Sequence, residues 1–247
     1  MFSVIFPGQG SQLVGMCSEL YAKYNIVKNI FNEADEILQY SLSKTILEGP
    51  AEELNKTEFT QPAIFLVSYS IYKLVSEEFK INLHKAAYFA GHSLGEYSAL
   101  ACSGALEFSE TLKILNKRGK AMQSAVPNNA GKMLVVINSS ISEIEKIIAY
   151  NKIECFIAND NSLNQIVVSG LKENIELFSK VLIEKKIKNI KIPVSAPFHC
   201  KLMNTATKKM EQELSKIKFK NLNVPIISNV TADEVKDKNL LPDLLLR

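Results

Sequence analysis

The first half of the chain alternates short apolar runs with long segments whose apolar residues recur every three or four positions. Residues 2–6 and 86–90 are apolar runs of strand length, and residues 61–79 between them have helical periodicity. Such alternation predicts an α/β fold with a mostly parallel sheet covered by helices. After Glu107, one apolar stripe with steps of four and three predicts a helix with Arg118 beside its buried face. The stripe consists of Phe108, Leu112, Leu115, Gly119, Met122 and Val126.

The pattern changes between residues 131 and 196. There it predicts a strand, a helix, two strands, a helix and a strand, which is typical of a ferredoxin-like βαββαβ subdomain. The expected strands cover residues 132–137, 155–158, 165–169 and 190–194, and the expected helices cover residues 142–150 and 173–185.

The α/β pattern resumes after this segment, with a helix over 202–217 and a strand over 224–228. The small subdomain is therefore expected to be an insert of residues 129–196. The catalytic domain is then discontinuous and comprises residues 1–128 and 197–247.

The composition is that of a globular protein. The chain has 247 residues, 47% of them hydrophobic and 22% charged, and no stretch approaches the roughly 20 apolar residues that a membrane helix needs. A net charge of +3 is too small to argue for nucleic acid. The start lacks a basic leader, and the four cysteines have no paired spacing, so we expect a cytoplasmic protein with reduced thiols. Arg118 and Arg247 are the only arginines among 29 basic residues, so Arg118 invites a specific role.

The segment Gly91-His92-Ser93-Leu94-Gly95 has the Gly-x-Ser-x-Gly pattern between an expected strand and an expected helix. A nucleophile elbow needs such a turn, because the flanking glycines let neighbouring backbone pass without a side-chain clash. The following helix directs free N–H groups toward the charge that develops during attack. The alternative is a chance glycine-serine turn that caps a helix. The strand before it and the helix after it favour the nucleophile.

A serine nucleophile needs a base, and the chain contains three histidines. His92 adjoins Ser93, so its ring should project away from the hydroxyl and shape the turn at most. His84 lies in a polar connection and is expected to be a solvated loop residue. His199 follows the apparent strand that ends near Phe198, at the sheet edge where catalytic groups gather, and is the better base. The alternative for His199 is a hydrogen-bonded structural histidine.

A second glycine turn, Gly8-Gln9-Gly10-Ser11-Gln12, follows the first strand at the same predicted edge. It would let the backbone N–H of Gln9 act as an oxyanion donor beside the N–H of Leu94. The alternative is a phosphate-type or plain turn. Nucleotide binding is disfavoured, because the third glycine of a dinucleotide motif and the lysine of a P-loop are missing.

These motifs together resemble the malonyl-CoA:acyl-carrier-protein transacylases of fatty acid synthesis. The resemblance runs in order along the chain and rests on Pro7-Gly8-Gln9-Gly10-Ser11-Gln12, Gly91-His92-Ser93-Leu94-Gly95-Glu96, Arg118-Gly119 with Met122-Gln123, and Pro197-Phe198-His199-Cys200. It implies an α/β-hydrolase-like domain with a ferredoxin-like insert. It also implies roles for individual residues: nucleophile Ser93, base His199, backbone oxyanion donors Gln9 and Leu94, and malonyl carboxylate clamp Arg118.

The resemblance implies substrates and partners as well. Malonyl-CoA would acylate the serine, and the phosphopantetheine thiol of an acyl carrier protein would then accept the malonyl group, with no resident cofactor or metal. Phe198 matches the malonyl type of acyltransferase. Asn159 and Asn161, in the expected loop 159–162, match asparagines near the carrier entrance, although turn formation explains them equally well. A monomer that binds neither nucleic acid nor membrane is expected.

The sequence departs from the family pattern in one respect. Family members orient the histidine through a residue in a later segment and continue with another strand and helix, whereas this sequence stops at Arg247. We therefore expect the orienting residue beyond Arg247, and a catalytic domain truncated at its C-terminus.

Two other functions remain open at this point. One is a serine thioesterase or esterase, and the other is a carrier-protein docking module with impaired catalysis. Arg118 disfavours a neutral acyl substrate, and Ser93 with His199 argues against lost catalysis.

Overall fold

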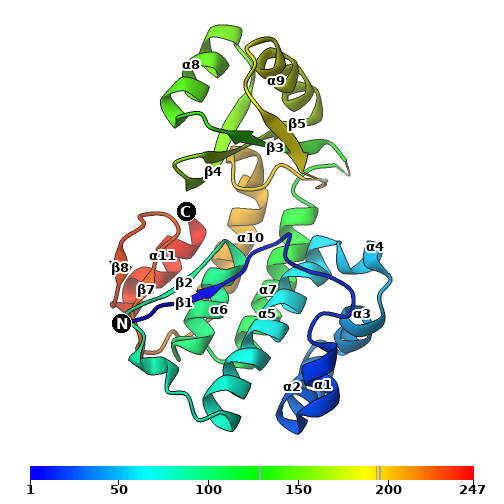
Figure 1. The fold of residues 1–247 in the computed structure, drawn as a ribbon, viewed down its shortest axis with the longest axis vertical. Helices are drawn as coiled ribbons and strands as arrows, with labels where there is room; N and C mark the ends of the chain where they lie inside the picture. The colour runs from blue at the N-terminus through cyan, green and yellow to red at the C-terminus, as the bar shows by residue number, and fades with distance from the viewer. Residues whose placement is uncertain (128, 193, 195) are drawn as a thin grey trace. The chain divides into compact units, whose positions relative to one another are not determined.

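The chain folds into two units. The large unit comprises Met1–Lys120 and Met210–Arg247, and the small unit comprises Ala121–Lys209 (Figure 1). The computed structural model describes residues 1–127, 129–192, 194 and 196–247. Asn128, at the expected end of the first domain segment, lies outside the described residues, and so do Pro193, in the expected strand 190–194, and Ser195.

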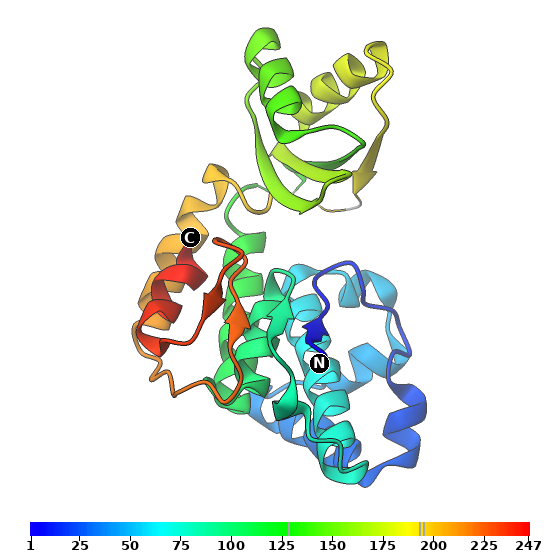
Figure 2. The same cartoon turned by 60° about the vertical axis from the view of Figure 1, so that its left-hand side comes forward.

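The sheet of the large unit has four strands in the order β1-β2-β7-β8 (Figure 2). They are β1 (Val4–Phe6), β2 (Phe89–Gly91), β7 (Ile226–Ile227) and β8 (Glu234–Val235). The first three are parallel, and β8 is antiparallel at the edge. The three strands predicted for this unit therefore exist, each shorter than expected. Because parallel strands end at one edge, the loops after β1, β2 and β7 gather there.

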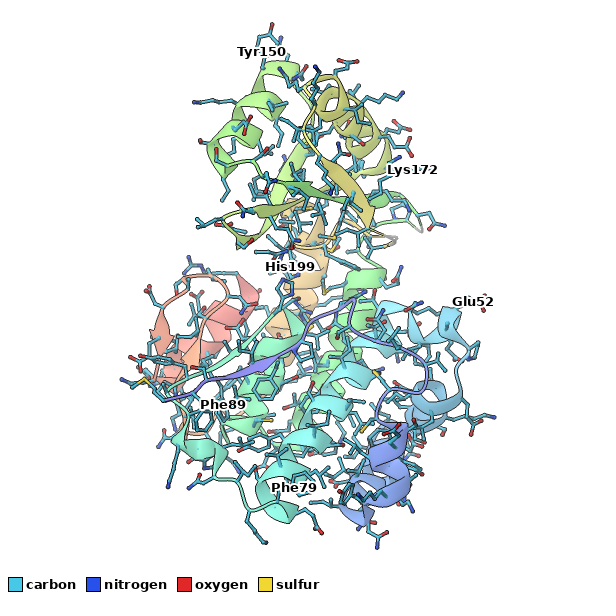
Figure 3. All side chains as sticks on the ribbon, viewed as in Figure 1. Glu52, Phe79, Phe89, Tyr150, Lys172 and His199 are labelled. Atoms are coloured by element: carbon cyan, nitrogen blue, oxygen red, sulfur yellow. The ribbon has the colours of Figure 1, made fainter. Side chains whose placement is uncertain are left out.

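Helices surround this sheet, and α6 is its most buried neighbour. Every residue of α6 is buried, and the helix packs against β2 and α5. Phe89 of β2, labelled in Figure 3, is fully buried and meets Phe6 edge to face at 5.7 Å between ring centroids. The helices that lie wholly or partly in this unit are α1 (Ser18–Lys23), α2 (Asn25–Leu38), α3 (Leu42–Glu48), α4 (Ala51–Leu54), α5 (Thr57–Lys73), α6 (Leu94–Cys102), α7 (Phe108–Gln123), α10 (Asn204–Leu214) and α11 (Leu241–Leu246).

Three helices of this fold differ from the sequence pattern at their ends. The helix expected over 202–217 is α10, which spans Asn204–Leu214. The helix predicted over 61–79 begins earlier, at Thr57, and after Lys73 it continues as a π-helical turn over Leu74–Glu78. The stripe predicted after Glu107 lies on α7, and its members up to Met122 fall within that helix, whereas Val126 lies beyond its end.

The small unit has the element order strand, helix, strand, strand, helix, strand. Its sheet order is β4-β5-β3-β6, and each neighbouring pair is antiparallel. Successive residues of β3 face opposite sides: Leu134 and Val136 pack with the helices, and Met133 packs in a second cluster. The elements are β3 (Gly131–Ile137), α8 (Ile141–Asn151), β4 (Cys155–Ser162), β5 (Gln165–Leu171), α9 (Lys172–Glu184) and β6 (Asn189–Ile192). Tyr150, near the end of α8, is exposed (Figure 3).

Strand β4 corrects the expected loop at 159–162. The strand continues through Ser162, with Asn159 opposite Val167 and Asp160 opposite Ile166. Two register irregularities interrupt this pairing, between Ile157 and Asn159 and between Asp160 and Ser162. The sequence predicted a loop because the polar residues 159–162 have low strand propensity. Pairing with the apolar strand β5 nevertheless keeps these residues in the sheet.

Candidate active site

Ser93 occupies the turn between β2, which ends at Gly91, and α6, which begins at Leu94. Its backbone has a φ of 53° and a ψ of −110°. A residue with a side chain adopts such a conformation at a cost on the order of 1 to 3 kcal/mol, so the surroundings must enforce it. The predicted strand, turn and helix are therefore confirmed, and Ser93 is the strained residue of the turn.

The glycines around this turn are required by space. A Cβ atom on Gly91 would lie 1.9 Å from the carbonyl oxygen of Gly95, and one on Gly95 would lie 2.5 Å from the carbonyl oxygen of Phe6. A Cβ on Gly8 would lie 2.6 Å from the carbonyl oxygen of His92. The turn after β1 and the turn at Ser93 are thus packed backbone against backbone.

The two expected oxyanion donors lie on these two turns. Leu94 is the first residue of α6, so its N–H is among those without a carbonyl partner inside the helix. Gln9 directly follows Gly8, and its side-chain amide donates a hydrogen bond to Oγ1 of Thr57 at 3.4 Å. The structure therefore brings the Gln9 turn against the elbow, as the sequence predicted.

Arg118 extends from α7 to the elbow. Its Nη2 lies 3.5 Å from Oγ of Ser93, and its Nη1 donates to Oε1 of Gln61 at 2.9 Å. The guanidinium carbon lies 5.6 Å from the centre of the Tyr97 ring, within range of a cation–π contact. Gln61 and Tyr97 are 1% and 2% exposed, whereas Arg118 is half-buried. A buried amide and a buried ring thus hold a cation beside the serine hydroxyl.

Glu96 is a buried carboxyl group in the first turn of α6, 4% exposed. Loss of hydration raises its pKa to about 7, although the Asn229 N–H and the Arg118 charge both favour the ionised form. Its Oε1 accepts a hydrogen bond from the backbone N–H of Asn229 at 3.3 Å.

Asn229 lies just beyond β7 and contacts both sides of the elbow. Its Oδ1 accepts from the backbone N–H of Ser93 at 2.7 Å, and its Nδ2 donates to the carbonyl oxygen of Gly91 at 2.6 Å. A residue 136 positions away in sequence therefore bridges the two ends of the turn.

The predicted base, His199, belongs to the small unit. It lies in the loop between β6, which ends at Ile192, and the 3₁₀ turn Lys201–Met203 (Figure 3). The expectation that a strand runs almost to His199 is wrong, because the residues from Ala196 to Cys200 are not in a strand. His199 is half-buried and has a φ of 57°. The catalytic role of His199 stays a prediction.

Three other predicted residues also lie in the small unit. Phe198 is 5% exposed and packs in a cluster with three methionines, Met122, Met133 and Met203. Asn159 is half-buried in β4, and Asn161 is exposed and donates from its side chain to Oε1 of Gln165 at 2.9 Å.

The other two histidines belong to the large unit. His92 is exposed on the elbow. His84 is exposed, as expected for a loop residue, but its Nε2 lies 2.8 Å from the hydroxyl of Tyr72 and its ring stacks with that side chain. The prediction of a simply solvated His84 is therefore incomplete.

The structure describes the whole chain except Asn128, Pro193 and Ser195. In that part of the chain, no group of three or more His, Cys, Asp and Glu side chains is arranged to hold a metal ion. No helix there has both the length and the apolar character to cross a membrane.

The arrangement suits acyl-group chemistry, because a strained serine at a helix N-terminus is flanked by backbone donors and by a cation. Residues 3–243 match the family described as acyl transferase domain. The enzyme class predicted from the motifs is thereby confirmed as acyltransferase.

Comparison with individual relatives shows which kind of acyltransferase the chain resembles. The malonyl CoA-acyl carrier protein transacylase of Escherichia coli (strain K12) is 39% identical over 250 residues, which cover 100% of this chain and 80% of the relative. The solved structure of the corresponding transacylase from Coxiella burnetii has a TM-score of 0.94 at 38% identity and covers 99% of this chain and 78% of that one. A malonyl-transacylase solved in complex with a type II PKS acyl-carrier protein has a TM-score of 0.94 at 35% identity, covering 100% and 80%. The chain belongs to the malonyl CoA-acyl carrier protein transacylase family.

Sequence reasoning missed three residues of the site. Gln61 and Glu96 were unassigned, because a polar residue within a helix gives no sign that it is buried. Asn229 directly follows a predicted strand at the edge where Ser93 was expected, and that position was a usable signal.

Proposed function

We propose that the chain transfers the malonyl group of malonyl-CoA to the phosphopantetheine thiol of an acyl carrier protein, for fatty acid synthesis, through a malonyl ester on Ser93. The names of its relatives support both substrates, and one relative was solved with a carrier protein. The observation that carries the proposal is the Arg118 guanidinium 3.5 Å from Oγ of Ser93. It provides a positive charge within reach of the distal carboxylate of an acyl group on that oxygen.

In the first half-reaction, His199 takes the proton of the Ser93 hydroxyl as its oxygen attacks the thioester carbon. The carbonyl oxygen becomes an oxyanion that the N–H groups of Leu94 and Gln9 stabilise. The carbon–sulfur bond then breaks, CoA leaves as a thiol with the proton from His199, and the malonyl group stays on Ser93.

In the second half-reaction, the phosphopantetheine thiol gives its proton to His199 and attacks the malonyl ester. The same two N–H groups stabilise the second oxyanion. Ser93 leaves and recovers the proton from His199, so one imidazole serves both halves of a ping-pong cycle.

Arg118 distinguishes this reaction from that of a neutral-acyl thioesterase or esterase. A planar guanidinium can give two parallel N–H bonds to a carboxylate, whereas lysine offers a point charge. The chain uses lysine for nearly all its other positive charges, which supports a specific reason for arginine at this position.

The remaining substrate contacts in the proposal come from the small unit. Phe198, the residue before His199 in sequence, favours a malonyl group as the acyl group. Asn159 and Asn161 contact the incoming carrier arm, since asparagine side chains can bond to its amides and hydroxyls.

The fold assignment is also part of the proposal. The large unit is α/β-hydrolase-like, and the small unit is ferredoxin-like, which its element order and the sheet order β4-β5-β3-β6 support. The domain limits of 1–128 with 197–247, and 129–196, remain predictions. So do the monomeric state and the cytoplasmic location.

Radiolabelled malonyl-CoA tests the proposal against its two competitors. A transacylase moves the label to holo acyl carrier protein, and a thioesterase releases free malonate. A docking module does neither. Label on the carrier in amounts well above free malonate is the expected result, and malonate release without carrier loading would refute the proposal.

A further inference from the structure

On the β7 side, strand β2 loses its backbone partner just before the elbow, whereas its pairing with β1 continues to Gly91. The parallel register between β2 and β7 pairs Phe89 with Ile226 and Ala90 with Ile227, and within the described residues it ends there. The carbonyl of Gly91 and the N–H of Ser93 then meet the side chain of Asn229 instead. A carboxamide has the same donor and acceptor as a peptide group, so Asn229 extends the ladder where the backbone of β2 turns away.

Asn229 is itself held by the helix that the elbow starts. Its backbone N–H donates to Oε1 of Glu96, in the first turn of α6. One residue thus connects the end of β2, the strained Ser93 and the start of α6. Its three hydrogen bonds reach three different residues of the elbow, Gly91, Ser93 and Glu96, so the contacts hold the turn at both of its ends.

The contact with Ser93 also divides the N–H groups of the elbow into two kinds. The N–H of Ser93 is directed to Oδ1 of Asn229 at 2.7 Å, so it does not face a reacting carbonyl. The next N–H along the chain, that of Leu94, belongs to the open end of α6. This division agrees with an oxyanion site built on Leu94.

We propose that Asn229 is a positioning residue that holds Ser93 in its strained, attack-ready conformation. The inference rests on the proposed function for the identity of the nucleophile. Without Asn229 the turn can relax toward an ordinary φ, which would move the Ser93 hydroxyl away from Arg118 and from the oxyanion donors.

The test compares Asn229→Ala with the matched control Asn239→Ala. Asn239 is an exposed asparagine in the same C-terminal segment, and its backbone N–H bonds to Asp237. Two rates are measured, covalent labelling of Ser93 by an aryl fluorophosphonate and malonyl transfer to carrier protein. Losing a hydrogen bond that leaves its partner unpaired costs about tenfold, so Asn229→Ala should slow both rates roughly 10- to 100-fold. The loss should appear in kcat, with the KM for malonyl-CoA changed less than about threefold, and Asn239→Ala should match the wild type.

Asn229→Asp adds a readout that a merely structural role would not move. The aspartate keeps an acceptor for the Ser93 N–H, but in its ionised form it has no donor for the Gly91 carbonyl and it lies beside the Glu96 carboxyl group. Protonation restores an O–H donor. The ratio of the variant's labelling rate to the wild-type rate should therefore rise as the pH falls from about 7 to about 4, the range in which an aspartate takes up its proton. Taking a ratio cancels the pH effects that the variant and the wild type share.

Three outcomes would contradict the role of Asn229, the proposed function, or both. Wild-type labelling rates in Asn229→Ala, or a flat pH ratio in Asn229→Asp, would overturn the inference. Labelling of wild-type Ser93 without malonyl transfer would refute the proposed function alone, because the labelling rates still test Asn229. Absence of labelling at Ser93 in the wild type, located by mass spectrometry, would refute both. Thermal unfolding of each variant checks that the enzyme is folded at the assay temperature.

Discussion

Replacing Arg118 with alanine removes the cation beside Ser93 and leaves the backbone contacts of the elbow in place. The carboxylate of a malonyl group on Ser93 then loses its partner. Truncating one member of a buried charge pair costs about 2 to 5 kcal/mol, or roughly 30-fold to several thousand-fold in kcat/KM. Because Arg118 is half-buried, solvent can screen part of the stranded charge, so we expect the lower part of this range.

An acetyl group has no distal carboxylate, so the same change should leave acetyl transfer level or faster. Arg118→Lys should recover little of the malonyl activity. Lysine keeps a charge, but it cannot bond to Gln61 and at the same time give two parallel N–H bonds to a carboxylate, as the guanidinium can.

The assay measures kcat/KM for malonyl-CoA and acetyl-CoA on each variant at fixed ionic strength. The control is thermal unfolding, because alanine at 118 leaves Oε1 of the buried Gln61 without its Arg118 donor, which costs roughly 1 to 3 kcal/mol of stability. Equal falls in kcat/KM for both substrates would make Arg118 a structural residue of α7, and the malonyl assignment would lose its main physical support.

Three further outcomes follow from the site. Ser93→Ala should abolish the malonyl-protein adduct in mass spectra, and an adduct that persists would identify another nucleophile. His199→Ala should slow both half-reactions by about 10²- to 10⁴-fold in single-turnover assays, whereas rapid acylation at neutral pH would mean that another base acts. Burial raises the pKa of Glu96 from its ordinary 4.5 to about 7, so the folded state holds this proton more tightly than the unfolded state does. The free energy of unfolding should therefore fall by up to about 3 kcal/mol as the pH rises from about 4.5 to about 7. Glu96→Gln should remove this fall. The free energy of unfolding is measured in urea at about pH 5 and pH 8, and a variant with the same difference between the two pH values as the wild type would contradict the prediction.

Most elements could be predicted from the sequence because their apolar periodicity is local. In the small unit, the helix expected over 142–150 is α8 at Ile141–Asn151, and the one expected over 173–185 is α9 at Lys172–Glu184. Strand β8 could not be predicted, because Glu234 and Val235 are too few residues to carry a pattern. The extension of β4 over polar residues was equally hidden, since it depends on pairing with β5.

The residues of the candidate site also fall into those that the sequence could predict and those that it could not. Local motifs predicted Ser93 and the Gln9 turn. The rarity of arginine in this chain pointed to Arg118. Gln61 and Glu96 could not be predicted, because their importance arises from burial against distant elements: Gln61 meets Arg118 across 57 positions. The sequence alone also suggested that a strand leads almost to His199, where the structure has a loop.

The elbow combines two kinds of constraint that leave different traces in a sequence. At Gly91 and Gly95 any side chain would overlap backbone atoms 1.9 Å and 2.5 Å away, so only glycine is compatible with the turn, and the requirement appears directly in the motif. At Asn229 the requirement is chemical: a short side chain must offer an acceptor to the Ser93 N–H and a donor to the Gly91 carbonyl. Among the common side chains only asparagine meets both conditions at that length, since aspartate lacks the donor and glutamine is one carbon longer. Position 229 should therefore tolerate substitution less than its exposed location suggests. A search for glycine motifs alone would miss residues such as Asn229, which hold Ser93 in place by hydrogen bonds.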